Sequence, residues 1–569
     1  MKRLLFERPT RSSFAEGSRS EDRHQGEVEL PLARSMSPAR DDMSITREPG
    51  DLQLALPGMV PGEHSGEGES PKPASQGLEE SDEVVVPKKP GNLVRSQGAG
   101  GGKDLGRGEH DNDHPFRAQD RRYGGQSGLR RVGERTRKEA LKSRNDREKL
   151  VNLFTHLRVD LLREVFLRLR KKAAPGVDGQ TWAEYAEGLD GRLKDLQDRL
   201  HRGSYRAPPV RRTHIPKADG TKRPLGIPTI EDKVVQGAVL ALLTPIYEVE
   251  FLDCSYGFRP GRNQHDALEA VARMLYRGKT SWVLDADIRS FFDTIDHDWM
   301  MRMLGDRIGD RRLLRLIRKW LKAGVLADGV LEASKEGTPQ GGKISPLLAN
   351  VYLHYVLDLW VRKEAKGMRG EVHLVRYADD FLIGVQLRDE AAELHRKVGE
   401  RLRVFGLELH PEKTRRVRFG RFARRDSPRL DGRKKPETFD FLGFTHICGV
   451  SRRGGFAVLR RTSRKKRVGK LKELRVEMRR RMHWKVRDQW RWLCSVLRGH
   501  YNYYGLPTNV RALKSFRYQV WLSWRKTLQR RSQKASLTRA KLELHDRRYP
   551  LPTPRIRAQQ PLRPLSPSI

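Results

Sequence analysis

A tight polar turn between two apolar runs limits what residues 373–385, HLVRYADDFLIGV, can form. Apolar residues lead into the tetrapeptide Tyr-Ala-Asp-Asp, residues 377–380, and apolar residues lead out of it. Two such runs around a short turn are typical of a β-hairpin. The adjacent carboxylates of Asp379 and Asp380 repel each other, and a hard cation such as Mg²⁺ would offset that repulsion. An ordinary solvated turn is the alternative, and this hairpin alone does not decide between them.

A second pair of carboxylates follows another apolar run, SWVLDADIRSFFDTID, which begins at Ser281. Its first residues predict a strand that leads into Asp285-Ala286-Asp287. Side chains alternate between the two faces of a strand, so Asp285 and Asp287 would share one face. Strands that carry carboxylates alternate with amphipathic helices in this part of the chain. The pattern predicts an α+β fold in which acidic side chains converge on one sheet.

The charge of the chain points to an extended polyanionic partner. The formal net charge is +42, and 33% of the residues are charged. Nucleic acid is the first candidate, and a membrane surface is the alternative. No apolar run approaches the length of a spanning helix, so we expect no membrane span. The three cysteines are Cys254, Cys448 and Cys494. They form no CxxC pair, so we expect no zinc site, and a reducing cytoplasm suits them.

Composition divides the chain into five parts. Residues 1–135 are rich in Gly, Ser, Pro, Glu and Arg, which predicts a disordered extension, or a wrongly assigned start of the gene. Residues 136–210 show helical periodicity, and residues 211–450 alternate between strand and helix patterns. Residues 451–548 are basic and helical in pattern, and residues 549–569 form a tail.

Two further stretches carry residues suited to a nucleotide or a nucleic acid. Lys217 and Arg223 flank a turn at Asp219-Gly220, so they would lie on opposite arms of a hairpin and could together hold a triphosphate. Solvated charge is an equally weighted alternative. Residues 337–350, GTPQGGKISPLLAN, form a Gly- and Pro-rich loop before an apolar helix. Backbone amides in such a loop can approach nucleic acid closely.

The part after residue 450 is strongly basic. Residues 451–487 contain sixteen Lys or Arg and two Glu, and Trp and Tyr residues follow among further cations. Cations suit phosphates and flat rings suit bases, so this part favours a structured RNA. The alternative is a helical core of aromatic residues with solvated charge around it, and we expect most of the Trp residues to be core. Candidate RNA contacts are Lys465, Lys466 and Arg467.

Taken in order, these stretches resemble the reverse transcriptases encoded by bacterial group II introns, also called intron maturases. The resemblance runs over roughly residues 150–555. Its motifs are APGVDG, IPKADGTKRPLGIPT, YGFRPGR, DADIRSFFDTID, TPQGGKISPLLANVYLH, YADD, GLELHPEKT, FLGF and RGHYNYYG. The resemblance implies a right-hand polymerase, with fingers, a palm built on a small antiparallel sheet, and an all-helical thumb or maturase domain. It also implies group II intron RNA, a DNA target or primer and dNTPs as partners.

The resemblance assigns roles to the acidic residues and to one lysine. Asp287, with the Ile288 carbonyl beside it, matches the first metal ligand, and Asp379 and Asp380 match the others. Two Mg²⁺ ions are the implied cofactors, and they would hold the attacking 3′-hydroxyl and the leaving pyrophosphate. Asp285 is the weaker candidate for a ligand. Lys413 matches a lysine that we assign as general acid to pyrophosphate.

The nucleotide contacts follow from the same resemblance. Lys217 and Arg223 match residues that grip the triphosphate. Phe292 matches a bulky residue beneath the sugar, which would exclude a 2′-hydroxyl, whereas plain core packing is its alternative. Gln340 and Gly341 match the loop at the nascent base pair and template.

Some residues depart from the family pattern, and the sequence leaves more than one function open. Arg289 stands where a lysine is usual, and no endonuclease motif follows Tyr549, so we expect no second-strand cleavage. Two alternatives to an active polymerase remain: an RNA-binding splicing maturase without polymerase activity, and a domesticated reverse transcriptase in defence or spacer acquisition. We expect a cytoplasmic, nucleoid-associated protein. The oligomeric state stays open, with a dimer as one option.

Overall fold

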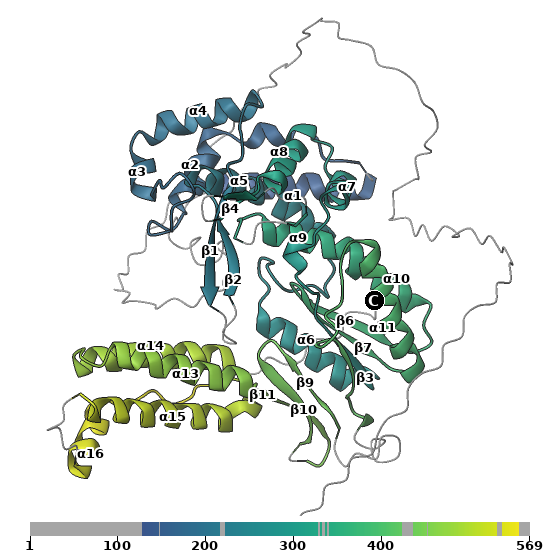
Figure 1. Ribbon diagram of the computed structural model, residues 1–569. Helices are drawn as coiled ribbons and strands as arrows, with labels where there is room; N and C mark the ends of the chain where they lie inside the picture. Colours follow the sequence, from purple (N-terminus) through teal and green to yellow (C-terminus); the bar gives the residue numbers. More distant parts are fainter. Residues whose placement is uncertain are drawn as a thin grey trace, which may run out of the picture. The chain divides into compact units, whose positions relative to one another are not determined.

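The computed structural model describes residues 128–556, apart from 147, 217–221, 328–329, 333–335, 338–340, 424–435, 452 and 532–537 (Figure 1). We predicted disorder for residues 1–135, and residues 1–127 of that stretch lie outside the described residues. Residues 128–135 are helical, because α1 spans Gly128–Asp146. The Glu164 carboxylate accepts a hydrogen bond from the Leu129 amide at 2.8 Å. This start of the helix therefore depends on a distant residue, which local sequence does not reveal. No described helix is long and apolar enough to cross a membrane.

One part of the molecule, built from segments on both sides of the acidic strand Trp282–Ala286 in the sequence, is mostly helical. Its helices are α1, α2 (Val159–Leu167), α3 (Trp182–Ala186), α4 (Leu189–His201), α5 (Ile230–Glu250), α7 (His297–Arg307) and α8 (Arg311–Lys322), with the 3₁₀ turn η1 (Leu153–His156). A small sheet with the order β2-β1-β4-β5 accompanies them. Its strands are β1 (Val210–Pro216), β2 (Lys222–Ile227), β4 (Val325–Ala327) and β5 (Val330–Glu332). β1 and β2 are antiparallel, as the turn at Asp219-Gly220 predicts.

The acidic motifs lie on a second sheet, with the order β6-β7-β3-β8. Its strands are β3 (Trp282–Ala286), β6 (Val372–Tyr377), β7 (Asp380–Val385) and β8 (Arg415–Arg418). β6 and β7 form the predicted hairpin, and β3 pairs antiparallel with both β7 and β8. The accompanying helices are α6 (Gln264–Arg277), α9 (Ser345–Leu353), α10 (Leu359–Lys366) and α11 (Arg388–Val404), with the 3₁₀ turn η2 (Phe291–Asp293) and the π-helical turn η3 (His354–Asp358).

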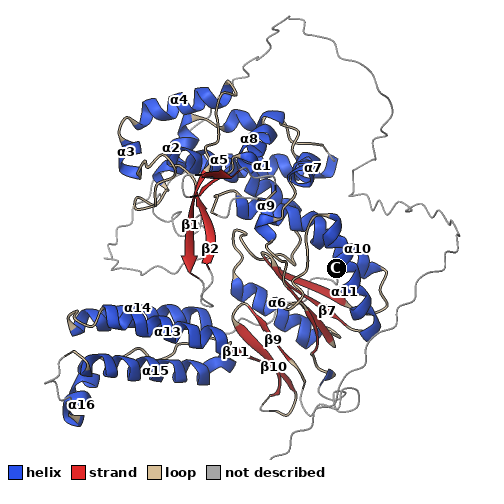
Figure 2. Ribbon diagram, viewed as in Figure 1, coloured by secondary structure: helices blue, strands red, loops and turns tan. Residues whose placement is uncertain are grey.

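Both faces of this second sheet are covered, which explains the nearly continuous apolar runs in its strands. On one face, Val283, Val375 and Leu382 share an apolar cluster with α6. α11 packs against β3, β7 and β8 (Figure 2). An Asn263 capping box starts α6, because the Asn263 side chain accepts from the Asp266 amide and the Asp266 side chain accepts from the Asn263 amide. The sheet is therefore held between layers and presents its strand ends at an edge.

A third sheet, β11-β10-β9, corrects one prediction. β9 (Thr438–Phe441) and β10 (Phe444–Val450) are the two arms of a hairpin around the FLGF motif. β11 (Phe456–Thr462) lies in the part predicted to be all helical. Its side chains alternate between exposed or half-buried and buried positions only over a few residues, and the basic residues around it obscure this pattern. β11 pairs with β10 over its whole length, so long-range pairing decides its conformation.

The chain continues into a helical bundle of α13 (Arg464–Arg480), α14 (Val486–Tyr504), the 3₁₀ turn η4 (Pro507–Asn509), α15 (Val510–Gln529) and α16 (Arg539–Arg548). Leu474, Leu493 and Phe516 are among its core residues. Trp524 is buried and donates a hydrogen bond to the Gln489 side chain at 2.9 Å, which fits the expectation that most Trp residues are core. Trp484 is the exception, because 47% of it is exposed.

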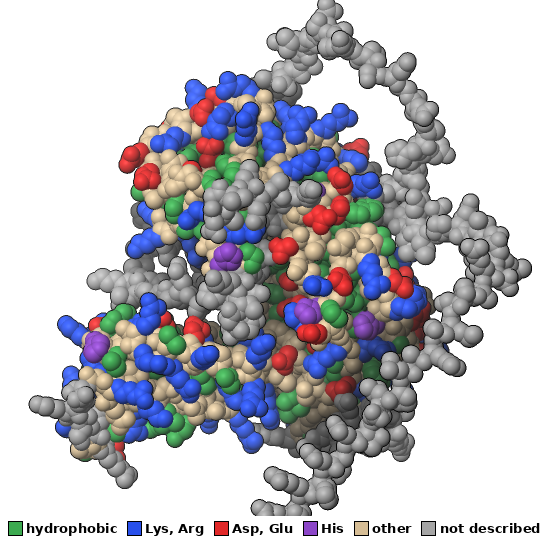
Figure 3. Space-filling view, in the orientation of Figure 1, with side chains coloured by type: hydrophobic (Ala, Val, Ile, Leu, Met, Phe, Trp, Pro, Cys, Tyr) green, Lys and Arg blue, Asp and Glu red, His purple; other side chains and the backbone are tan. Residues whose placement is uncertain are grey.

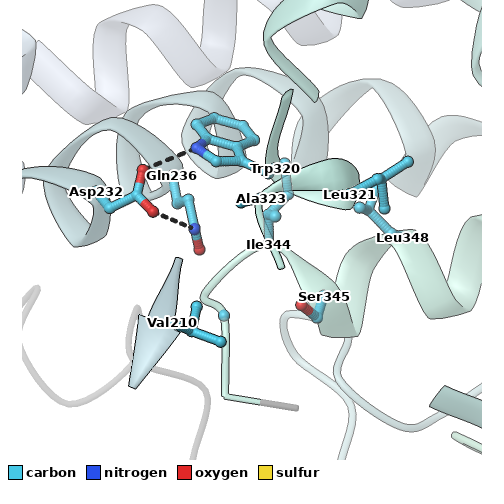
Figure 4. A pocket seen from close by; sticks show the side chains of 10 residues that line it. Val210, Asp232, Gln236, Trp320, Leu321, Ala323, Ile344, Ser345 and Leu348 are labelled. Atoms are coloured by element: carbon cyan, nitrogen blue, oxygen red, sulfur yellow. Dashed lines mark hydrogen bonds between the residues drawn. The ribbon is translucent and has the colours of Figure 1, made fainter. Parts of the chain in front are cut away.

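A buried polar network ties the helical part together around Asp232 on α5 (Figure 4). The Trp320 indole on α8 donates to Asp232 Oδ1 at 2.9 Å, and the Tyr205 hydroxyl donates to the same oxygen. Gln236, one turn further along α5, accepts from the Lys343 amide at 2.8 Å. Burial raises the pKa of Asp232 to about 6, although the hydrogen bonds from Tyr205 and Trp320 oppose the rise.

The raised pKa of Asp232 predicts a stability that depends on pH. Between about pH 4 and pH 6 the folded protein keeps a proton that the unfolded chain has lost, so this group lowers the free energy of unfolding as pH rises. Asp232→Asn removes the titration. The free energy of unfolding of wild type minus that of the variant should therefore fall as pH rises through this window. Urea denaturation at several pH values would measure it. The control Asp298→Asn alters an exposed acid on α7, and a constant difference for Asp232→Asn would contradict the prediction.

Candidate active site

Three of the predicted site aspartates meet at one edge of the second sheet. Asp287 directly follows β3, and Asp380 begins β7. The two strands pair antiparallel with Ala286 opposite Phe381, so Asp287 emerges beside the start of β7. Asp379 lies in the hairpin turn between β6 and β7, whose arms close with Tyr377 opposite Asp380. The register of a single strand pair therefore brings these carboxylates together from distant parts of the sequence.

This end of the sheet carries more carboxylates than cations. Burial, together with the charges of Asp379 and Asp287, raises the pKa of Asp380 to about 7, while Lys413 acts in the opposite direction. Asp380 nevertheless keeps contact with solvent. Burial also raises the pKa of Asp285 to about 6, against the effect of Arg415. Neighbouring carboxylates disfavour each other's charged form, and a bound cation would stabilise their charged forms.

Lys413 reaches this cluster from the segment before β8. Its ammonium lies 2.5 Å from Asp287 Oδ2, although 60% of the lysine side chain remains exposed. The His410 amide donates to the Asp287 carbonyl at 2.8 Å, and the Arg289 amide donates to the Glu408 carbonyl at 2.8 Å. Residues 408–410 therefore run antiparallel to residues 287–289, which places the following turn and Lys413 beside Asp287.

Ile288 lies between these two backbone hydrogen bonds, opposite Leu409. Its side chain is buried. In such a non-hydrogen-bonded pair, the carbonyl of each residue points away from the partner segment. The Ile288 carbonyl is thus directed away from residues 408–410, to the side of β3 on which β7 lies. This orientation suits the ligand role that the family resemblance assigns to it.

The turn that carries Asp379 has a strained backbone and is stabilised by the buried side chain of Arg376. Ala378 has a φ of 57°, a left-handed conformation that is unfavourable for residues other than glycine. The Arg376 guanidinium donates to the Ala378 carbonyl at 3.0 Å. Arg376 is fully buried and forms two hydrogen bonds to the Asp358 carboxylate, at 2.7 and 2.6 Å. The Arg376 side chain also donates to Asn350 Oδ1 at 2.9 Å.

Gly257 completes this support, and the sequence pattern did not single it out. Asn350 donates to the Gly257 carbonyl at 2.8 Å. A Cβ atom at Gly257 would lie 2.3 Å from the Ala378 amide nitrogen, so only glycine fits here. The signal that sequence reasoning missed is a charged residue in each of two apolar stretches: Arg376 within its strand and Asp358 within its helix.

The structure places the other predicted contacts as follows. Phe291 is buried, whereas Phe292 is half-buried, so core packing accounts for the first ring better than for the second. Gly341 has a φ of 121°, and a Cβ atom there would lie 2.2 Å from the Gly226 carbonyl oxygen. The loop around Gly341 thus packs directly on β2. Lys217, Gln340 and the side chain of Arg223 lie outside the described residues.

Lys465, Lys466 and Arg467 belong to the first turns of α13. Lys465 and Lys466 are exposed, and Arg467 is half-buried. No described hydrogen bond or ion pair connects these three side chains with the aspartates. Lys and Arg side chains also cover much of the visible surface of the bundle (Figure 3). The candidate RNA contacts and the carboxylate cluster are thus formed by different residues on different elements.

Within the described residues, no group of three His, Cys, Asp or Glu side chains is arranged to hold a metal ion by itself. The donor set nevertheless fits Mg²⁺, which takes one or two protein carboxylates and completes its coordination with water and substrate phosphates. Asp287, Asp379 and Asp380 supply hard oxygen ligands of this kind.

Comparison with known proteins agrees with this geometry. Residues 215–446 match the family of reverse transcriptases, described as RNA-dependent DNA polymerases. Protein YkfC of Escherichia coli (strain K12) is 38% identical over 243 residues, which make up 37% of this chain and 63% of YkfC. The group II intron-encoded protein LtrA of Lactococcus lactis subsp. cremoris is 39% identical over 227 residues, 38% of each chain. The chain thus matches less than two thirds of the length of these relatives.

A structure of telomerase from Candida albicans, in complex with a fragment of telomeric RNA, covers 64% of this chain and 61% of its own, with a TM-score of 0.36 and 13% identity. That likeness is too weak to argue from. The family match and the sequence relatives define the class: residues 215–446 are a reverse transcriptase domain. The relatives that the chain matches include group II intron-encoded proteins.

The packing of Gly257 against Ala378 predicts that Gly257→Ala lowers primer extension by about 100-fold, because displacing a reacting group by about 1 Å costs this much. The added methyl group must push the turn that carries Asp379. Single-nucleotide extension of a DNA primer on an RNA template would measure the loss. The matched control is Gly305→Ala on α7, where a Cβ atom meets nothing within 4 Å. Equal activity of the two variants would show that the turn tolerates the displacement.

Proposed function

We propose that this protein is an RNA-directed DNA polymerase that binds group II intron RNA, assists its splicing and copies it into DNA. The observation that carries the proposal is the meeting of Asp287, Asp379 and Asp380 at the ends of β3 and β7 within a reverse transcriptase domain. Reverse transcriptases as a class use divalent metal ions. The names of the relatives support the intron and splicing roles: LtrA is an intron-encoded protein, and another relative is a nuclear intron maturase of Arabidopsis thaliana.

In this proposal the elements correspond to the parts of a right hand. The helical part with β1 and β2 corresponds to the fingers, and the β6-β7-β3-β8 sheet corresponds to the palm. The α13–α16 bundle corresponds to the thumb. The fingers would hold the triphosphate through Lys217 and Arg223, and Gln340 and Gly341 would contact the nascent base pair and template.

The reaction is an in-line displacement. The primer 3′-hydroxyl attacks the α-phosphorus of a dNTP, a new P–O bond forms, and the bond to pyrophosphate breaks. Two Mg²⁺ ions, when bound, would lower the pKa of the hydroxyl and neutralise the triphosphate charge. Asp287, Asp379, Asp380 and the Ile288 carbonyl would hold those ions. Lys413, whose ammonium already lies at Asp287, would donate a proton to the leaving pyrophosphate.

Phe292 would set the preference for deoxyribonucleotides. Its ring follows Asp287 by five residues and is only half-buried, which leaves part of it open beside the site. A bulky ring beneath the incoming sugar would clash with a 2′-hydroxyl and leave room for a 2′-hydrogen. The polymerase would then select dNTPs by shape.

The metal role of the turn predicts that Asp379→Ala lowers DNA synthesis by about 1,000-fold, because several kcal/mol of transition-state stabilisation depend on the metal. RNA binding should remain within about twofold of wild type, because the basic surface is elsewhere. Primer extension with RNA template, dNTPs and Mg²⁺ measures the first, and filter binding of the intron RNA measures the second. Asp298→Ala, on the exposed face of α7, serves as the control. An Asp379→Ala variant that still polymerises would refute the metal assignment.

The same assay separates the polymerase from an RNA-binding maturase without polymerase activity. A wild-type protein that assists splicing of its intron but extends no primer would leave only the second function. The basic residues of the bundle suit both functions, so RNA binding alone does not discriminate between them.

The basic start of α13 predicts a salt-dependent contact with RNA. Neutralising Lys465, Lys466 and Arg467 with Gln should make the slope of log K against log salt shallower by about 2, since each phosphate contact contributes about 0.7. The control neutralises cations that are paired with a Glu four residues on: Arg130, Arg135 and Arg396. An unchanged slope for the α13 variant would place the RNA on another surface.

A further inference from the structure

The β9–β10 hairpin turn has an unfavourable residue in its first central position. Phe441 pairs with Phe444, so Leu442 and Gly443 form a two-residue loop. Their φ values are 47° and 77°, both in the left-handed region. Hairpin loops of this kind favour Asn, Asp or Gly at both positions, because other side chains are strained there. A leucine at this place needs support from the surrounding structure.

That support comes from the RGHYNYYG motif at the end of α14, a motif to which the reaction above assigns no task. The Tyr503 hydroxyl donates to the Leu442 carbonyl at 2.9 Å. The Gly443 carbonyl accepts from the Ser463 amide at 2.9 Å, just before α13. A Cβ atom at Gly443 would lie 2.9 Å from the Tyr504 hydroxyl, so the turn is closely packed against the bundle.

Tyr503 also connects this turn with the polymerase site. The His265 ring on α6 lies 2.8 Å from the Tyr503 carbonyl oxygen, to which its Nε2–H donates. The Tyr503 ring packs against the same apolar cluster as Tyr377 of the YADD motif and Leu442.

The β9 strand approaches the acidic cluster as well. Arg415 donates to the carbonyl of Thr438, the first residue of β9, at 3.1 Å, and the same guanidinium lies 3.5 Å from the Asp285 carboxylate. The Asp440 carboxylate accepts from the Ser463 hydroxyl at 2.8 Å. β9 is thus linked to Asp285 through Arg415 and to the segment before α13 through Ser463.

We propose that Tyr503 is a positioning residue of the polymerase site, supplied by the C-terminal bundle, and that it fixes the β9–β10 turn relative to the YADD hairpin. The inference rests on the proposed polymerase function. Tyr503 touches neither nucleotide nor metal and acts through Leu442 and His265. It makes the position of the YADD hairpin, and therefore the rate of nucleotide addition, depend on the bundle.

The test compares two neighbouring Tyr→Phe variants of the full chain. Tyr503→Phe removes only the hydroxyl that binds Leu442, and should lower kcat/KM for primer extension about tenfold, the effect of losing one buried hydrogen bond of about 1.4 kcal/mol. Tyr504→Phe is the matched control, because no described hydrogen bond involves the Tyr504 hydroxyl. The loss should fall mainly on kcat, the melting temperature should fall by at most about 3 °C, and RNA affinity should match wild type. Equal kinetics of the two variants would overturn the proposal.

A second pair of variants tests the connection to α6. His265→Ala removes the donor to the Tyr503 carbonyl and should lower primer extension, whereas His265→Gln keeps an N–H donor and should restore most of the activity. No rescue by glutamine, at equal melting temperature, would contradict a positioning role through Tyr503. If wild type itself extends no primer while binding RNA, the proposed polymerase function fails. If wild type is active and Tyr503→Phe is unaffected, only this inference fails.

Discussion

The buried ion pair between Arg376 and Asp358 is the interaction on which the candidate site depends. Both side chains are fully buried, and their hydrogen bonds are 2.6 and 2.7 Å long. Burying two charges is costly, so such a pair adds little net stability compared with apolar residues of the same shape. Its contribution here is geometric. Arg376 also holds the Ala378 carbonyl and Asn350, so the pair fixes the conformation of the turn that carries Asp379.

Two hairpin turns near the site share one design. Each contains a non-glycine residue with positive φ, Ala378 in one and Leu442 in the other. Each is held by a side chain from outside the turn, whose donor binds the carbonyl of the strained residue: Arg376 in the first, Tyr503 in the second. A strained backbone persists only where the surroundings determine it, and such strain gathers at functional sites. The two supports come from different parts of the chain, since Arg376 lies on β6 and Tyr503 lies on α14.

Local sequence patterns predicted the β6–β7 hairpin, the strand before Asp287 and the aspartates at the ends of these strands. They could do so because side-chain alternation and turn preferences depend on neighbouring residues. They missed features that depend on distant partners. α1 starts at Gly128 because Glu164 accepts from its first turn, and β11 is a strand because β10 pairs with it. Gly257 is required because Ala378 lies against it. The family resemblance supplied the roles of the aspartates, and spacing alone would have left them as an ordinary turn.

The charge distribution explains why polymerisation would need a metal. A net charge of +42 draws the chain to nucleic acid, and the α13 surface displays part of that charge. The reacting phosphates, however, would have to approach the most acidic edge of the molecule, where burial and neighbouring carboxylates raise the pKa of Asp380 to about 7. Carboxylates and a triphosphate repel each other unless a divalent cation lies between them. Nucleic acid would therefore bind with or without metal, whereas the nucleotide would bind productively only with it.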